Sequence, residues 1–133
     1  MGPNRRVVVL VSILAAGLAA GACSNPAAPT PDPVRVDPIQ IDKVDVLISQ
    51  TAPPQASAHV TGVVGDGCST LKSVTQARSG NAVTLTILRE RPVDAVCSQL
   101  ARVYDDTLAL EGTYPAGRYT LTVNGREVAF QTE

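Results

Sequence analysis

The chain has 133 residues, of which 11 are basic and 12 are acidic, and its formal net charge at pH 7 is −1. This balance argues against binding of nucleic acids, because phosphate neutralisation needs clustered lysine and arginine. Three tyrosines, one phenylalanine and no tryptophan are present, so the core of any folded domain must be built mainly from Val, Leu, Ile and Ala.

The first segment has the three parts of a secretory signal. Arg5 and Arg6 give a positive start, Val7–Leu18 is apolar apart from one serine, and Ala20–Ala22 is small enough for a peptidase cleft. A transmembrane helix is the alternative, but the 16 residues from Val7 to Ala22 would span only about 24 Å of a hydrocarbon core about 30 Å thick. We therefore expect residues 1–22 to be a cleaved signal peptide, which leaves a mature net charge of −3.

The run Leu18-Ala19-Ala20-Gly21-Ala22-Cys23 resembles the lipobox of bacterial lipoproteins. It departs from the usual pattern at Ala20, where leucine is common, and ordinary secretion is the alternative. The resemblance implies a diacylglycerol and an N-acyl lipid on Cys23, which would anchor the protein stably to a membrane of the cell envelope. Ser24 stands where such proteins often carry the aspartate that retains them at the inner membrane, so outer-membrane sorting (periplasmic face or cell surface) is compatible with the sequence.

Five prolines lie between Ser24 and Pro38. Proline disfavours helix and sheet and favours an extended chain of about 3.1 Å per residue. We expect residues 23–38 to be the lipidated cysteine and a disordered tether that reaches up to about 45 Å.

From residue 39 onward apolar residues alternate with polar ones, which indicates strands with one buried face. The alternation is clearest in Val83–Ile87 and Tyr119–Val123, and Asn124-Gly125 is a strong hairpin signal because both turn positions need a positive φ. A change of parity predicts a bulge near Asp42-Lys43. Further apolar faces are expected at Ile39/Ile41, Val44/Val46/Ile48, Ala58/Val60/Val64, Leu108/Leu110 and Val128/Phe130.

Glycine and proline clusters separate these runs every 8–12 residues. Leu71–Arg78 keeps neither period well but is interpreted as a strand, and Val93–Leu100 as a short helical turn or a crossover. The pattern predicts an all-β fold over residues 39–133, an antiparallel two-sheet sandwich of about seven strands.

Cysteines are three in number, and lipidation of Cys23 would leave Cys68 and Cys97 as a pair. Because export leads to an oxidising compartment, we expect a disulfide between them. A metal or redox site is the alternative, but there is no Cys-x-x-Cys, and His59 is the sole histidine.

The segment LEGTYPAGRYTLTVNG, Leu110–Gly125, resembles the closing hairpin of bacterial immunoglobulin-like and fibronectin type III-like domains. The resemblance implies a tyrosine corner, in which the Tyr119 hydroxyl bonds to upstream backbone. Tyr114, placed in the turn, is expected to tolerate loss of its hydroxyl. The core tryptophan of antibody domains is missing, which favours a divergent sandwich.

Catalytic groupings are not evident. His59 falls on the outward parity of its strand, and no nucleophile elbow is present. Asp105-Asp106 is interpreted as a turn before a strand and a poor carboxylate dyad. Asp42 with Asp45, or Gly65-Asp66-Gly67, lack the ligand spacing of a calcium loop. Arg89-Glu90-Arg91 is interpreted as a charged strand end that opposes edge pairing.

Two functional hypotheses follow. The first is a lipid-anchored envelope protein, not an enzyme, whose domain binds or scaffolds an envelope protein or polysaccharide. The second is an inhibitor or ligand-capturing protein that uses end loops such as Thr51–Pro54 or Gly65–Gly67. Neither hypothesis calls for a cofactor, a metal, a nucleic acid or a small-molecule substrate.

Overall fold

The computed structural model describes residues 26–133, so the expected signal peptide and Cys23 lie outside the described residues. Pro31–Glu133 forms one compact unit. Residues 26–30 belong to a separate unit, in which they are exposed and have no regular secondary structure. In the described part of the chain no helix is long and apolar enough to cross a membrane.

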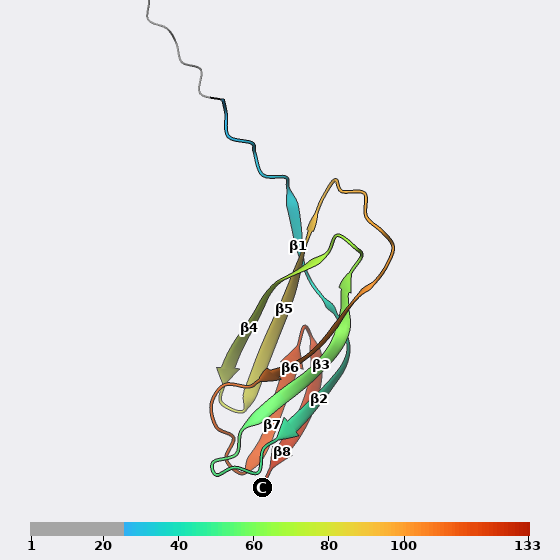
Figure 1. The fold of residues 1–133 in the computed structure, drawn as a ribbon. Helices are drawn as coiled ribbons and strands as arrows, with labels where there is room; N and C mark the ends of the chain where they lie inside the picture. Colours follow the sequence, from blue (N-terminus) through green and yellow to red (C-terminus); the bar gives the residue numbers. More distant parts are fainter. Residues whose placement is uncertain (1–25) are drawn as a thin grey trace, which may run out of the picture. The chain divides into compact units, whose positions relative to one another are not determined.

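Eight strands make up the compact unit (Figure 1). They are β1 Val34–Pro38, β2 Gln40–Ile48, β3 Ala56–Gly65, β4 Thr70–Ser79, β5 Ala82–Pro92, β6 Arg102–Ala109, β7 Gly117–Val123 and β8 Arg126–Thr132.

The strands form two sheets. The larger one has the order β1-β5-β7-β8, with β4 on the other side of β5, and the smaller one has the order β2-β3-β6. The long strand β5 pairs with β4 along its length, with β7 through its first half and with β1 through its second half. The sandwich therefore depends on β5 as the axis of the larger sheet.

The core lies between the sheets and follows the period-two pattern. Every second residue of β3 is buried from Ala56 to Val64, and the same holds for Val83, Leu85 and Ile87 of β5. Three aromatic rings, those of Tyr114, Tyr119 and Phe130, pack together with centroids 5.2–5.7 Å apart. Three of the four aromatic residues of the chain thus form one cluster, and the fourth, Tyr104, is buried elsewhere in the core.

The predicted fold class is confirmed: the described chain is all-β and forms two packed sheets. The bulge is confirmed as a register shift between Ile41 and Lys43 in the β2–β3 pair. The hairpin between β7 and β8 is confirmed too, with positive φ values of 46° at Asn124 and 86° at Gly125. Leu71–Arg78 lies within β4, as interpreted.

Three differences concern the architecture. There are eight strands among the described residues rather than about seven, and the β5–β7 pair is parallel. The domain also begins before residue 39, because Val34–Pro38 pairs with β5 as a strand. Proline at the end of β1 is compatible with pairing because it lies at the edge of the sheet.

Two local interpretations were wrong, and for a third the structure decides between the two alternatives. Asp105-Asp106 lies inside β6, where its backbone pairs with β3, rather than in a turn. Arg89–Arg91 lies between β1 and β4, so it does not protect an edge. Residues 93–101 contain no helical turn and form the crossover from the larger to the smaller sheet, which was the alternative.

Candidate binding surfaces at the two ends of the sandwich

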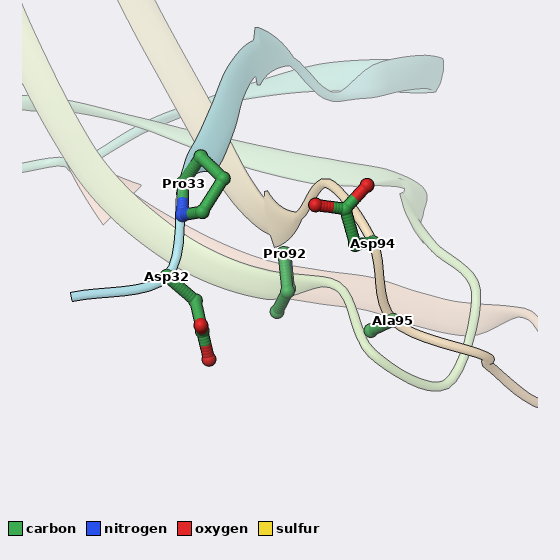
Figure 2. Close-up of a pocket in the computed structure, with 5 residues that line it drawn as sticks. All are labelled: Asp32, Pro33, Pro92, Asp94 and Ala95. Atoms are coloured by element: carbon green, nitrogen blue, oxygen red, sulfur yellow. The ribbon is translucent and has the colours of Figure 1, made fainter. Parts of the chain in front are cut away.

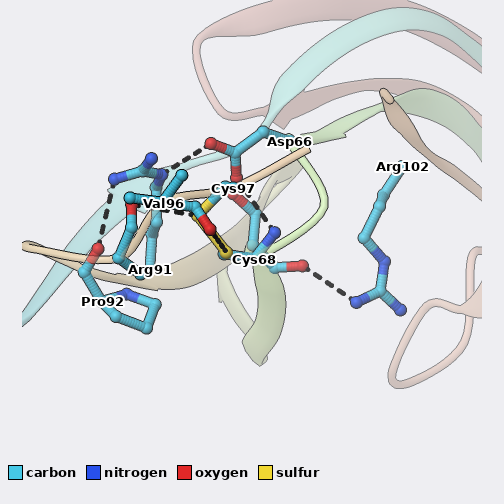
Figure 3. The surroundings of a disulfide bond; sticks show 9 residues. Asp66, Cys68, Arg91, Pro92, Val96, Cys97 and Arg102 are labelled. Carbon is cyan, nitrogen blue, oxygen red and sulfur yellow. Dashed lines mark hydrogen bonds and ion pairs between the residues drawn. A yellow bond between two sulfur atoms is a disulfide. The ribbon is translucent and has the colours of Figure 1, made fainter. Parts of the chain in front are cut away.

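The Cys68–Cys97 disulfide is confirmed, with Cα atoms 5.4 Å apart. It joins the β3–β4 loop to the crossover 93–101 (Figure 3). The backbone N–H of Gly67 donates a hydrogen bond to the carbonyl oxygen of Ser98 at 3.0 Å. A Cβ atom at Gly67 would collide with the Ser98 hydroxyl, so glycine permits this close approach. The two loops are therefore held together by a covalent bond and a hydrogen bond.

Asp66 organises the β3–β4 loop beside this disulfide. Its Oδ2 lies 2.8 Å from Nε of Arg91, and its Oδ1 accepts hydrogen bonds from the Ser69 hydroxyl at 2.9 Å and the Cys68 N–H at 3.2 Å (Figure 3). The bond from Arg91 is the main cause that lowers the pKa of Asp66 below its ordinary value, against an opposing effect of desolvation. The Asp66 carboxylate thus holds the β3–β4 loop together through Arg91, Ser69 and the Cys68 N–H.

The crossover presents apolar side chains to solvent. Val96 is fully exposed, at 103 %, and Leu100 is 77 % exposed. Val93 and Val103, at 50 % and 73 %, flank them. The backbone beneath them is fixed, because Cys97 follows Val96 and is bonded to Cys68. A fixed loop with exposed apolar side chains is a typical interaction surface.

The chain enters the sandwich at the base of this loop. The N–H of Val93 donates to the carbonyl oxygen of Pro33 at 2.9 Å. A cavity of about 220 Å³ lies there, lined by Asp32, Pro33, Pro92, Asp94 and Ala95 (Figure 2). In Figure 2 the two carboxylates point in different directions, so they do not converge on one ligand. We call the region formed by Asp32–Pro33, Gly65–Ser69 and Pro92–Ala101 the tether end.

The opposite end of the sandwich carries the β2–β3 loop and the β6–β7 loop (Figure 1). We call these loops, Ser49–Gln55 and Leu110–Ala116, the far end. The β2–β3 loop is closed by bonds from the Ser49 N–H to the Gln55 carbonyl oxygen at 2.8 Å and from the Gln55 N–H to the Ser49 hydroxyl at 2.9 Å. The Tyr114 N–H ties it to the β6–β7 loop through the Pro54 carbonyl at 3.0 Å.

An open depression of about 280 Å³ lies beside the β2–β3 loop. Its lining includes Leu47 and Ile48, which are 53 % and 37 % exposed. The remaining lining residues are Ser49, Gln55, Ala56, Ser57 and Ala109. The far end thus combines a rigid loop with a partly apolar hollow.

The aromatic cluster packs against the far end, because Tyr114 belongs to both. The Tyr119 hydroxyl donates to the carbonyl oxygen of Pro115 at 2.8 Å, four residues upstream, which has the form of a tyrosine corner. Tyr114 lies in the loop between β6 and β7, as expected, but it is fully buried and its hydroxyl donates to the carbonyl oxygen of Glu111 at 3.2 Å. The guanidinium of Arg78 lies 4.3 Å from the centre of the Tyr114 ring and donates to the Thr113 carbonyl at 2.9 Å. Both tyrosines are therefore structural.

His59 lies on the outer face of the smaller sheet, between two aspartates. Its Nε2 is 2.8 Å from Asp105 Oδ1, and its Nδ1 is 4.0 Å from Asp45 Oδ2. The carboxylates lie at opposite ring nitrogens, so they cannot share a metal ion with the imidazole. Within residues 26–133, no three His, Cys, Asp or Glu side chains are grouped so that they could hold a metal ion.

Sequence reasoning located the disulfide and both loops named for contact, Thr51–Pro54 and Gly65–Gly67, which the structure places at opposite ends of the sandwich. It missed the crossover as a candidate surface. Val93, Val96 and Leu100 are spaced by three and four residues, which is a helix period, so their spacing favoured a helical turn and did not indicate exposure.

These features define a small disulfide-linked β-sandwich domain with a candidate surface at each end. The family model of the ORF11 beta-sandwich domain matches residues 58–132, and the chain belongs to this family. No solved structure matches the chain.

Similar curated proteins come from Herpetosiphon aurantiacus. The "Uncharacterized 10.2 kDa protein in HgiCIIM 5'region" is 30% identical over 86 residues, which cover 65% of this chain and 92% of that protein. The "Uncharacterized 10.2 kDa protein in HgiBIM 5'region" is 31% identical over 72 residues, which cover 54% and 88%. The chain is thus similar to small proteins along most of their length.

Proposed function

We propose that this protein is a lipid-anchored lipoprotein of the bacterial cell envelope whose β-sandwich binds a partner without catalysing a reaction. The observation that carries the proposal is the Cys68–Cys97 disulfide. It accounts for two of the three cysteines and is typical of an oxidising compartment. The third, Cys23, stands at the end of the lipobox-like run Leu18–Cys23, where a free thiol has a chemical use.

The anchor is tested by Cys23→Ser in the full chain, expressed in a bacterium. The expected result is loss of the protein from the membrane fraction and of the lipid adduct from the mature N-terminus in mass spectrometry. Ser24→Ala is the matched control and should keep both. A Cys23→Ser protein that still fractionates with membranes would contradict the proposal.

A second function, capture or inhibition of another envelope protein, is favoured by the closed β2–β3 loop and the hollow beside Leu47 and Ile48. Thr51–Pro54, one of the two loops expected to make contact, lies at this end. A partly apolar hollow next to a fixed loop suits a peptide segment, because docking there orders few side chains.

This second function is tested by purifying the lipidated protein from its own envelope and identifying what co-purifies. Leu47→Asp should remove a partner that binds at the far end. Thr84→Asp, on the exposed outer face of β5, is the control and should retain it. A partner retained equally by both variants would exclude the far end as its site.

A further inference from the structure

We propose that the tether end docks on the lipid bilayer itself, with the side chains of Val96 and Leu100 in its interfacial region. The inference rests on the proposed anchor at Cys23, and it adds an orientation: the crossover faces the membrane and the far end faces away. It assigns a ligand class, a lipid surface, to the most exposed apolar residues of the sandwich.

The length of the tether limits how far the tether end can lie from the membrane. Asp32 is nine residues after Cys23, and three of the residues between them are prolines. At about 3.1 Å per residue this segment reaches about 28 Å when extended. The first hydrogen bond of the crossover, from Val93 to Pro33, lies directly after it. A lipid on Cys23 would therefore hold the crossover within about 30 Å of the bilayer.

The apolar side chains are presented at fixed positions. Val96 and Leu100 are 103 % and 77 % exposed, while the Cys68–Cys97 disulfide and the Gly67–Ser98 hydrogen bond fix the backbone between them. Docking would bury these side chains without ordering a flexible loop, so little conformational entropy is lost. A linked second contact also benefits from the high effective concentration that the anchor provides.

The charges at this end favour an apolar mode of contact. Asp66 is paired with Arg91, and Arg102 donates to the Ser69 carbonyl oxygen at 3.2 Å (Figure 3). Asp32 and Asp94 are exposed carboxylates at the base of the crossover (Figure 2). The residues of the tether end include no lysine or arginine. The arginines that border it, Arg35, Arg91 and Arg102, are held by Asp37, Asp66 and the Ser69 carbonyl oxygen. Attraction to anionic headgroups therefore does not explain docking. Insertion of aliphatic side chains into the interfacial region of the bilayer explains docking.

A lipid surface fits better than a protein partner at this end, because the anchor would keep the bilayer within about 30 Å of the crossover, whereas a protein partner would have to reach it by diffusion. The far end, with its fixed loop and hollow, has no anchor beside it. The two ends are therefore assigned different partners.

The absence of tryptophan from the chain gives a direct test. Leu100→Trp and, as the matched control, Leu47→Trp at the far end are made in the full lipidated protein and reconstituted into phosphatidylcholine vesicles. Brominated phosphatidylcholine should quench the indole of Leu100→Trp at least about twofold more than that of Leu47→Trp, because quenching needs contact with the lipid. The result should be the same when phosphatidylglycerol is added.

Flotation of the vesicles separates the two proposals. A protein that does not float with the vesicles would contradict the anchor, whereas one that floats but shows equal quenching for both variants would overturn the docking alone. Quenching that occurs only with phosphatidylglycerol would overturn the apolar mode. An indole that is blue-shifted in native membranes but not quenched by lipid in vesicles would mean that a protein covers the crossover, and would also overturn the proposal.

Discussion

The side-chain amide of Asn124 satisfies both backbone hydrogen-bonding groups of Ile87. Its Oδ1 accepts from the Ile87 N–H at 2.9 Å, and its Nδ2 donates to the Ile87 carbonyl oxygen at 2.9 Å and to that of Ile39 at 3.0 Å. Ile87 lies where β5 has left β7 and has not yet met β1. β7 and β1 pair with different halves of β5 on the same side of that strand. The Asn124 side chain thus supplies hydrogen bonds to β5 at the position between them.

Asn124→Gly should destabilise the domain by about 2–4 kcal/mol, because it removes the partner of the Ile87 N–H and of the Ile39 carbonyl oxygen, at about 1–3 kcal/mol for each group. The Ile87 carbonyl oxygen keeps its bond from the Ile39 N–H. Glycine keeps the positive φ of this position, so the loss reports the amide and not the turn. The free energy of unfolding in urea measures it. The control is Asn81→Ala. The Asn81 side-chain amide donates to the carbonyl oxygen of Arg118 in an exposed position, and its loss should lower the free energy of unfolding by less than about 1 kcal/mol. Equal losses for the two variants would remove this role of Asn124.

Asn124 also shows how far the sequence predicts the fold. The dipeptide Asn124-Gly125 indicated a hairpin, because turn chemistry is local. The bonds from Asn124 to Ile39 and Ile87 join residues 85 and 37 positions apart, and no periodicity encodes such a pairing. For the same reason the alternation in β5 and β7 predicted two strands but not their parallel contact.

Some features of the candidate surfaces were likewise predictable from the sequence, and others were not. Cys68 and Cys97 were predictable as a pair from the number of cysteines and the expected export of the chain, because the chemistry of cysteine limits the choices. The exposure of Val96 and Leu100 was not predictable, because an apolar residue in a short segment between strands can be buried or exposed depending on what packs over it. For Tyr114 the turn was predicted but its burial was not, because that burial depends on contacts with Tyr119 and Phe130.

Tyr119→Phe should destabilise the domain by about 1 kcal/mol or more, since it removes a short hydrogen bond from a buried hydroxyl to Pro115. Tyr114→Phe should now also destabilise it, by less, because its bond to Glu111 is longer, at 3.2 Å. The midpoint of thermal unfolding is measured for the two variants and for the parent protein. A parent-like midpoint for Tyr119→Phe would remove the tyrosine-corner assignment.

Acid should weaken the tether end through Asp66. The pKa of this carboxyl is lowered in the folded protein, mainly by the hydrogen bond from Arg91. Its contribution to stability is therefore present above the unfolded-state pKa of about 4 and is lost as the pH falls below it. Asp66→Asn should lower the unfolding midpoint at pH 7, and the difference from the parent should narrow towards pH 3. The exposed Asp94→Asn should match the parent at both pH values; a difference for Asp66→Asn that does not change with pH would contradict the argument.

Removal of the disulfide should loosen the tether end, while the β-sandwich fold persists. Cys68→Ala/Cys97→Ala opens a loop of about 30 residues and should cost roughly 2–4 kcal/mol in the free energy of unfolding. The strand content, measured by circular dichroism, should persist, because the alternating core residues of β3, β5 and β7 remain. Hydrogen exchange at the Gly67 N–H should accelerate more than at the Tyr114 N–H, since only the former bridges the two loops that the disulfide joins. Thiol titration of the unfolded, unreduced parent domain should find neither Cys68 nor Cys97 free. Equal acceleration at both amides would mean that the disulfide stabilises the sandwich as a whole and does not hold the crossover in particular.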